Sequence, residues 1–213
     1  MIKLEKTDIF GWESAIRGMR NPMNSWDKSD SLYMNNTAVP MDGKTLYSMG
    51  DNDLALMRKL AKAGDDHGKF LRFIGVTVDI TAPLYWWKEF DTYKVGTVAN
   101  SCSTMHKIHA KPFEMDDFSH EHLLTGSRFL LRTIIEMLND ARGAFIESKD
   151  KDWWWQMIQL LPSSYNQKRT VQLNYQVLKS MYFARRNHKL DEWREFCKWC
   201  ESLPYFREVV IQE

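Results

Sequence analysis

The pattern of apolar and polar residues divides the chain into strand-like and helix-like segments. Alternating apolar positions rich in β-branched residues predict strands. These are residues 2–8, 70–80 and 206–212. Apolar residues that recur every three or four positions predict helices. These are residues 9–19, 51 or 53 to 63, 83 to about 95, 117–147, 152–161, 163 or 164 to 187, and 190–202. The order predicts a helix-rich α+β fold with a small central sheet, in a single domain over residues 1–213.

Two stretches show no regular spacing. Residues 21–43 are rich in Asn, Asp, Ser and Pro, which favour turns. This segment is long for a structureless loop, so we expect it to be functional or ordered by packing. Residues 97–115 are also predicted to be irregular.

Composition narrows the class of protein. The 213 residues are 44% hydrophobic, which excludes a fully disordered chain. A net charge of +1 gives no sign of a strongly basic nucleic-acid binder. Three cysteines are too few for a disulfide scaffold and suit a reducing compartment. No secretory signal and no membrane-spanning run is visible, so we expect a cytoplasmic protein without membrane contact.

Several short motifs have an ordinary structural explanation. Cys197 and Cys200 have a redox or zinc half-site spacing but no second pair nearby, so we interpret them as semi-buried thiols on a helix. His120 and His122 would not share a helix face, and no metal site is predicted. The three tryptophans at 153–155 point in different directions on a helix, which favours core and interface packing over base stacking.

Two polar clusters are candidates for a ligand site. The first is a run of hydroxyl, Lys and His side chains within residues 91–107, which would suit a phosphate-bearing ligand or form a solvated loop. The second is Arg185 and Arg186, late in a predicted helix. These guanidinium groups could clamp an anion or simply offset the helix dipole.

The order of these features resembles the flavin-dependent (alternative) thymidylate synthases. The resemblance covers about residues 50–200. His67, the strand after it and the helix start at Ala82-Pro83 follow the family order. The Arg-His-Arg motif of that family then falls on Thr92, Tyr93 and Lys94. The Ser of the family falls on Cys102, or on Ser103 with one inserted residue. Downstream matches are Leu161-Pro162, Asn174, Arg185 or Arg186, and the stretch from Asp191 to Glu195.

This resemblance implies a cofactor, a substrate and an assembly. In that family FAD, dUMP and methylenetetrahydrofolate yield dTMP, with a reduced nicotinamide as hydride source. The implied flavin-facing residues are His67, Thr92, Tyr93, Lys94 and Asn174. The implied nucleotide-facing residues are Glu89, Ser101, Cys102, Ser103, Arg185 and Arg186. The reaction requires no enzyme nucleophile, so we assign no catalytic residue. The resemblance also implies a homotetramer with sites shared between subunits.

Departures from the motif leave three hypotheses open, and the sequence does not separate one of them, an enzyme that uses the same pocket for another substrate, from the two described next. Lys94 alone keeps a cation of the Arg-His-Arg loop, Glu89 replaces a Gln, and Met105 replaces an Arg. Each lost phosphate contact would cost about 1.5–3 kcal/mol. The first hypothesis is a divergent enzyme of this type that acts on or binds a pyrimidine nucleotide. The alternative is a non-catalytic protein that kept the fold, binds a nucleotide or another phosphate ligand, and lost flavin binding.

Overall fold

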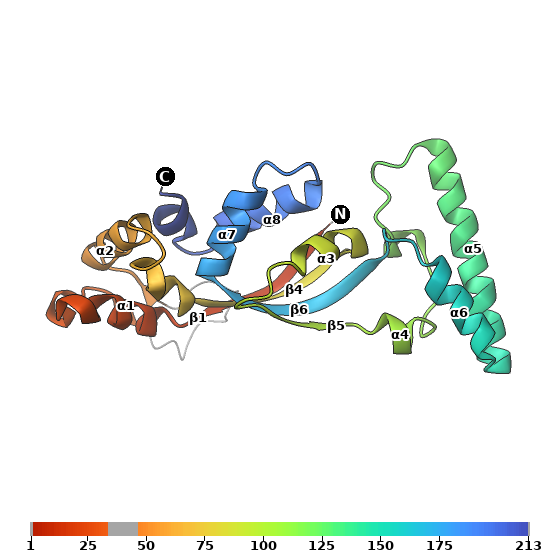
Figure 1. Cartoon of the computed structure of the whole chain (residues 1–213), viewed down its shortest axis with the longest axis horizontal. Helices are drawn as coiled ribbons and strands as arrows, with labels where there is room; N and C mark the ends of the chain where they lie inside the picture. Colours follow the sequence, from red (N-terminus) through yellow and green to blue (C-terminus); the bar gives the residue numbers. More distant parts are fainter. Residues whose placement is uncertain (1, 34–46, 213) are drawn as a thin grey trace. The chain divides into compact units, whose positions relative to one another are not determined.

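The computed structural model describes residues 2–33 and 47–212 (Figure 1). Its helices are α1 Trp12–Arg20, α2 Asp51–Lys62, α3 Leu84–Phe90, α4 Thr104–Lys107, α5 Thr125–Ser148, α6 Lys151–Leu160, α7 Tyr175–Arg185 and α8 Asp191–Ser202. Its strands are β1 Lys3–Phe10, β2 Leu32–Tyr33, β3 Tyr47–Ser48, β4 Gly75–Pro83, β5 Val98–Ser101 and β6 Asn166–Asn174. This is the helix-rich α+β fold with a small sheet that the sequence predicts.

Contacts within the chain define two units. Unit 1 comprises Met1–Lys3, Ile80–Thr92 and Asn100–Arg169. Unit 2 comprises Leu4–Asp79, Tyr93–Ala99 and Thr170–Glu213. The single domain over residues 1–213 stays a prediction.

The main sheet has four strands in the order β1-β4-β6-β5. β4 follows the alternation of its sequence, because Val76, Val78 and Ile80 are fully buried and the residues between them are half-buried. The prediction of a strand over residues 2–8 is confirmed by β1. The prediction over residues 70–80 is correct only in its second half, since Gly68–Arg72 forms a short 3-10 helix, η3.

β6 corrects the largest error of the sequence analysis. We predicted one helix from residue 163 or 164 to 187, and the structure has a strand followed by the shorter helix α7. Within the strand Gln167, Val171 and Leu173 are buried, all at odd positions. This period of two fits a strand and not a helix. The segment predicted as irregular, residues 97–115, likewise contains β5 and α4.

The predicted strand at the carboxyl end is also wrong. Arg207–Ile211 forms a π-helical turn, η5, that packs against α2. Val209 and Val210 are both buried there. Adjacent strand residues point to opposite faces, so a strand could not bury both against the same helix.

The remaining helices exist where predicted but differ at their ends. The predictions for α2, α6 and α8 are confirmed to within one or two residues. The predicted helix over residues 117–147 begins only at Thr125, because Phe118 instead forms a bridge with Tyr165. α3 ends at Phe90, well before Gly96.

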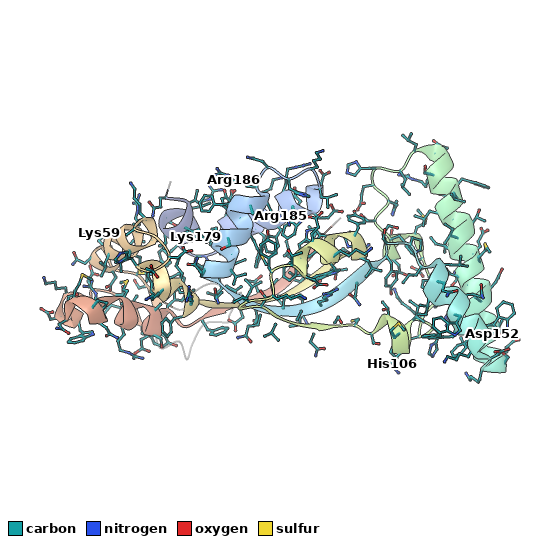
Figure 2. All side chains as sticks on the ribbon, viewed as in Figure 1. Lys59, His106, Asp152, Lys179, Arg185 and Arg186 are labelled. Atoms are coloured by element: carbon teal, nitrogen blue, oxygen red, sulfur yellow. The ribbon has the colours of Figure 1, made fainter. Side chains whose placement is uncertain are left out.

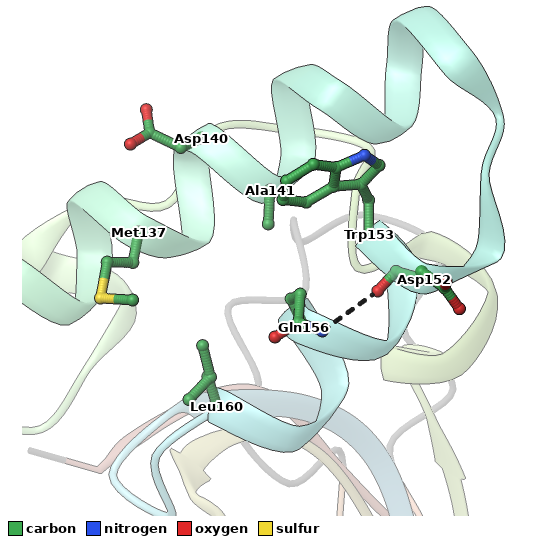
Figure 3. A pocket seen from close by; sticks show the side chains of 7 residues that line it. All are labelled: Met137, Asp140, Ala141, Asp152, Trp153, Gln156 and Leu160. Carbon is green, nitrogen blue, oxygen red and sulfur yellow. Dashed lines mark hydrogen bonds between the residues drawn. The ribbon is translucent and has the colours of Figure 1, made fainter.

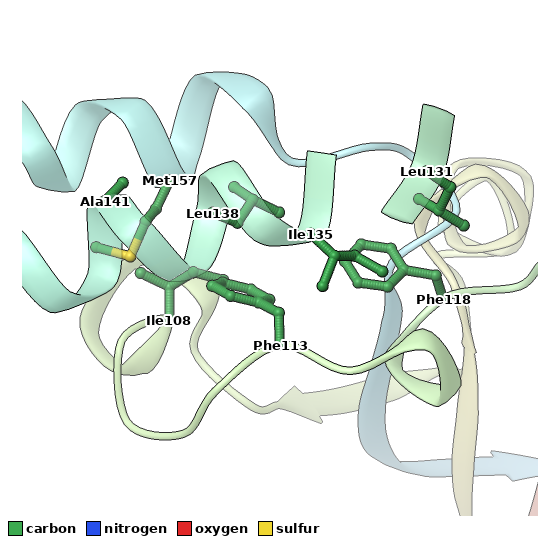
Figure 4. Close-up of a cluster of buried hydrophobic side chains, with 8 residues drawn as sticks. All are labelled: Ile108, Phe113, Phe118, Leu131, Ile135, Leu138, Ala141 and Met157. Atoms are coloured by element: carbon green, nitrogen blue, oxygen red, sulfur yellow. The ribbon is translucent and has the colours of Figure 1, made fainter. Parts of the chain in front are cut away.

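Unit 1 has its core beneath the α5–α6 hairpin (Figure 4). Eight buried apolar side chains from both helices and from residues 108–118 pack together. They are Ile108, Phe113, Phe118, Leu131, Ile135, Leu138, Ala141 and Met157. On α5 the buried positions recur at 131, 135, 138 and 141, so only one stripe of the helix faces this cluster.

Unit 2 has an aromatic core. Tyr175 lies with its ring centroid 5.4 Å from Trp12 and 5.5 Å from Phe206, both edge to face. Its hydroxyl donates a hydrogen bond to the carbonyl of Pro204 over 2.7 Å. Helix α7 also packs against η3 and α8, so this core fixes the start of α7.

Part of the turn-rich segment 21–43 is ordered by a buried carboxylate. Asp53 on α2 accepts hydrogen bonds from the side chain of Arg20, from the Ser29 hydroxyl and from the backbone N–H groups of Asp30 and Ser31. Asp30 in turn accepts from the first N–H groups of α2, at residues 52 and 53, and caps that helix. This part of the segment is therefore ordered by packing, and residues 34–43 lie outside the described residues.

Candidate functional site

The start of α7 lies against the loop that carries Tyr93 and Lys94. Asn174 caps α7, because its Oδ1 accepts a hydrogen bond from the N–H of Val177 over 3.1 Å. Gly96 has a φ of 76° and approaches this turn closely. A Cβ at Gly96 would lie 3.1 Å from Val177 Cγ2 and 3.3 Å from Asn174 Nδ2. Glycine therefore permits the loop to pack on the helix start.

The end of α7 holds a guanidinium group between two aromatic rings. Arg185 Nε donates to the Tyr93 hydroxyl over 2.9 Å. The Arg185 guanidinium lies 4.8 Å from the Trp193 ring centroid and 5.6 Å from that of Tyr93. These cation–π contacts fix the charge beside Tyr93. The structure thus places a cation against one residue of the segment where the Arg-His-Arg motif was expected.

Two further cations in unit 2 face solvent. Arg186 is exposed and lies over the Phe183 ring at 5.3 Å (Figure 2). Lys94 is also exposed. Of the three cations Arg185, Arg186 and Lys94, Arg185 alone is half-buried, and because arginine stays charged at neutral pH this position keeps a fixed positive charge.

His67 is exposed and immediately precedes η3. Close to it in sequence, Asp65 accepts from Gln176 Nε2 over 3.0 Å and pairs with Lys179 Nζ at 3.5 Å. The Gln176 Oε1 atom is buried without a hydrogen-bond partner. The buried Thr97 hydroxyl also has no hydrogen-bond partner. These two atoms leave hydrogen-bonding capacity unused near the start of α7.

In unit 1 the predicted nucleotide residues lie on β5, α3 and α4. The N–H of Cys102 donates to the Lys168 carbonyl over 2.9 Å, and its carbonyl accepts from Gln167 Nε2 over 2.9 Å. The Ser103 hydroxyl caps α4 by accepting from the N–H of His106 over 3.0 Å. Ser101 lies exposed on β5. The Thr92 hydroxyl donates to the Glu89 carbonyl over 2.7 Å, so it closes the end of α3.

Arg169 on β6 is a charged residue that the sequence analysis missed. Its guanidinium lies 4.1 Å from the Trp87 ring centroid and 2.7 Å from Asp91 Oδ1. Its Nε donates to Gln167 Oε1 over 3.0 Å. We had placed this residue in a helix. The alternation of Gln167, Val171 and Leu173 is the signal that would have placed Arg169 on a strand.

The implied flavin residues are divided between the units. His67, Tyr93, Lys94 and Asn174 belong to unit 2, and Thr92 ends a segment of unit 1. The implied nucleotide residues are also divided. Glu89, Ser101, Cys102 and Ser103 belong to unit 1, and Arg185 and Arg186 belong to unit 2. The ligand roles of all these residues stay predictions.

The cysteines of the chain differ in exposure, since Cys102 is exposed and the two on α8 are not. Over residues 2–33 and 47–212, no three His, Cys, Asp or Glu side chains are grouped to hold a metal ion. Cys197 and Cys200 are buried on α8. Burial raises the pKa of Cys197 to about 11 and that of Cys200 well above its usual range. Both thiols are protonated at neutral pH and are weak nucleophiles, as we expected for structural cysteines.

Among the helices of the described chain, none combines the length and apolar character that crossing a membrane requires.

The fold of this chain is similar to that of the flavin-dependent thymidylate synthases. A crystal structure of thymidylate synthase X (ThyX) from Helicobacter pylori with FAD and dUMP matches with a TM-score of 0.69 and 14% identity, over 99% of this chain and 97% of that chain. A second ThyX structure from Helicobacter pylori, complexed with FAD and dUMP, matches with a TM-score of 0.67 and 15% identity, over 97% and 98%. No family model and no curated protein matches the sequence. At this identity the likeness shows the fold alone.

Proposed function

We propose that this protein binds a phosphate-bearing pyrimidine nucleotide, with dUMP as the reference ligand, and a flavin, as a divergent thymidylate synthase-like enzyme. The observation that carries the proposal is the fold match over 99% of this chain and 97% of a ThyX chain that holds both ligands. Because fold alone does not fix function, the proposal also needs suitable residues. By the same resemblance we propose that the protein is cytoplasmic and forms a homo-oligomer, specifically a homotetramer.

Positive charge at the end of α7 supports nucleotide binding. Arg185 is oriented by the Tyr93 hydroxyl and by two aromatic rings, and Arg186 follows it in an exposed position. Guanidinium groups match the geometry of phosphate oxygens and stay charged at any physiological pH. An oriented guanidinium also loses less side-chain entropy when it binds an anion.

The residues assigned to the flavin also carry the kinds of chemical groups that a flavin dinucleotide needs. Its diphosphate needs cations, and Lys94 offers one directly beside Tyr93. The exposed His67 and the Asn174 amide offer hydrogen bonds to a polar ring. When bound, a flavin supplies the hydride-transfer chemistry of this class. The protein's own residues would neutralise phosphate charge and orient the ring.

A specific observation favours the alternative, a non-catalytic nucleotide-binding protein. Thr92 and Tyr93 carry no charge, and their hydroxyls bond to the Glu89 carbonyl and to Arg185. Glu89 adds a carboxylate that would repel phosphate. A protein of this kind would bind dUMP without flavin.

Two binding measurements separate these functions. The visible absorbance of the purified full chain, with and without added FAD, reports flavin binding. Isothermal titration calorimetry with dUMP reports nucleotide binding. Flavin together with dUMP supports the enzyme, and an assay for dTMP formation from dUMP, methylenetetrahydrofolate and reduced nicotinamide then follows. Binding of dUMP without flavin selects the alternative, and binding of neither ligand overturns the proposal.

A paired variant tests the residues. Arg185→Ala combined with Arg186→Ala removes both guanidinium groups, and we expect dUMP affinity to fall at least about a hundredfold, since each charged contact contributes about 1.5–3 kcal/mol. Arg58→Ala changes an exposed arginine on α2 and serves as the matched control. Unchanged dUMP affinity in the paired variant would reject the assignment of these two arginines.

A further inference from the structure

The α5–α6 hairpin of unit 1 exposes large apolar side chains on the surface away from its core. On α5, Phe129 is 70% exposed, Leu130 59% and Met137 52%. On α6, Trp153 and Trp155 are also exposed. Soluble monomers rarely expose so many large apolar groups on one element, and such patches mark interaction sites. We call Phe129, Leu130, Met137, Trp153 and Leu160 the hairpin surface.

A recess lies within this surface, between the two helices. Its volume is about 570 Å³. Its lining residues are Met137, Asp140, Ala141, Asp152, Trp153, Gln156 and Leu160 (Figure 3). The side chains are mainly apolar, and the carboxylates of Asp140 and Asp152 add negative charge. An occupant must therefore bring apolar side chains together with a positive charge.

The chain itself carries such an element, the amino-terminal half of α5. Arg132 is exposed on α5 two turns before Asp140, and the exposed Phe129 and Leu130 lie close to it. The exposed charges along this helix are thus basic first and acidic later, whereas the half-buried Arg142 donates to the carbonyl of His109. Two α5 helices that pair antiparallel bring the basic part of each against the acidic part of the other.

In one antiparallel register of two α5 helices, opposite charges face each other and a large side chain faces a glycine. When Arg132 faces Asp140 of a second copy, Phe129 faces Gly143 of that copy by the same spacing. A side chain added at Gly143 would meet open space within its own chain, so there is room for an aromatic ring. Glu136 lies at the midpoint of the pairing and faces Glu136 of the second copy, and Arg132 one turn earlier on each helix offsets these two like charges.

We propose that the hairpin surface binds the same surface of a second copy of this chain, with Arg132 of each copy paired to Asp140 of the other. This names the surface of the homo-oligomer within the proposed function, on which it rests. A partner protein of different sequence would need its own matching pattern, whereas the self-complementary order of charges on α5 already matches a second copy. The pairing uses none of the residues assigned to nucleotide or flavin.

Sedimentation velocity of the full chain over a range of concentrations tests the pairing. We expect Arg132→Asp and Asp140→Arg, each alone, to weaken association about tenfold or more, because each places like charges together at both symmetric contacts. The double variant restores opposite charges, and we expect it to associate as the wild type does. Arg58→Asp, on α2, is the matched charge-reversal control and should leave association unchanged.

A second variant tests the apolar part of the hairpin surface. Met137→Glu places a carboxylate beside the recess on an already exposed position, so we expect a folded chain that does not self-associate, with circular dichroism as the check on folding. A monomeric wild type would overturn the proposal. Association that Met137→Glu and the single reversals leave intact would show an oligomer built on another surface. Loss of association in the singles without recovery in the double variant would reject the pairing of Arg132 with Asp140. Because these experiments measure assembly and the absorbance and calorimetry measure ligand binding, the two proposals can fail separately.

Discussion

At the scale of single residues, hydrogen bonds fix where charge lies in unit 2. The Tyr93 hydroxyl and the Trp193 ring hold the Arg185 guanidinium, and Asp53 holds that of Arg20. The first cation is half-buried and the second almost fully buried. Burial thus assigns Arg20 a structural role, and the ligand role proposed for Arg185 is left to the binding measurements.

Tyr93→Phe isolates the orienting hydrogen bond, since it removes the hydroxyl and keeps the ring over Arg185. We expect dUMP affinity to fall about threefold to tenfold, because a single hydrogen bond contributes about 0.5–1.5 kcal/mol. Calorimetry at constant salt measures this change. Ser202→Ala removes a hydroxyl that donates to the Trp199 carbonyl at the end of α8, away from every residue assigned to a ligand, and it is the control. Equal affinity in Tyr93→Phe and wild type would show that the hydroxyl does not prepare Arg185 for the anion.

Asp53→Asn tests the buried ion pair. The variant leaves Arg20 buried without a counter-charge, and we expect it to lower the free energy of unfolding by about 3–5 kcal/mol. Urea unfolding monitored by circular dichroism measures this loss. Asp51→Asn, at an exposed position of the same helix, is the control. A loss below about 1 kcal/mol would show that the pair contributes little to stability.

The same carboxylate predicts how stability depends on pH. Burial alone would raise the pKa of Asp53, but hydrogen bonds from Ser31, Ser29 and Arg20 outweigh it and lower the pKa below its ordinary value of 3.8. The folded state thus favours the charged form, so the stabilisation is complete above pH 3.8 and is lost as the pH falls through the lowered pKa. The Asp53→Asn variant should lack this component of acid destabilisation.

At the scale of elements, local pattern predicts helices better than it predicts strands here. α2, α6 and α8 were predicted from helical spacing, and their bounds in the structure agree to within one or two residues. β6 was missed because its apolar residues are few and its remaining positions are polar or charged, so its alternation is weak. At the carboxyl end the error was the reverse, a strand predicted where a helical turn forms. β-branched residues favour strands, but Val209 and Val210 lie in the turn η5.

Asn174 joins a strand to a helix and has both a structural and an implied ligand role. Asn174→Ala removes the cap of α7, and we expect the free energy of unfolding to fall by about 0.5–2 kcal/mol. Asn174→Ser keeps a capping oxygen and removes the amide. If the amide faces the flavin, Asn174→Ser should retain stability and lose flavin affinity in a fluorescence titration. Retention of both properties would limit Asn174 to its capping role.

At the scale of the whole molecule, the likeness to the two ThyX structures is one of fold, at 14% and 15% sequence identity. The order of His67, β4 and α3 along the chain was enough to predict the fold class. It could not place the guanidinium of Arg185 beside Tyr93, because these residues are 92 positions apart and only tertiary packing brings them together. Arg169 was missed for a similar reason, since its contacts with Trp87 and Asp91 require β6 to be a strand.

The charge of the bound ligand gives the last test of the whole molecule. If the guanidinium groups of α7 bind the phosphate of dUMP, deoxyuridine should bind at least about tenfold more weakly, because it lacks the anion. Increasing salt should weaken dUMP binding and leave deoxyuridine binding nearly unchanged, since exposed cations such as Arg186 are screened. Calorimetry with both ligands at low and high salt measures these differences. Equal affinities at low salt would mean that the base and sugar alone are recognised, and the role proposed for the arginines of α7 would then fail even if dUMP binds.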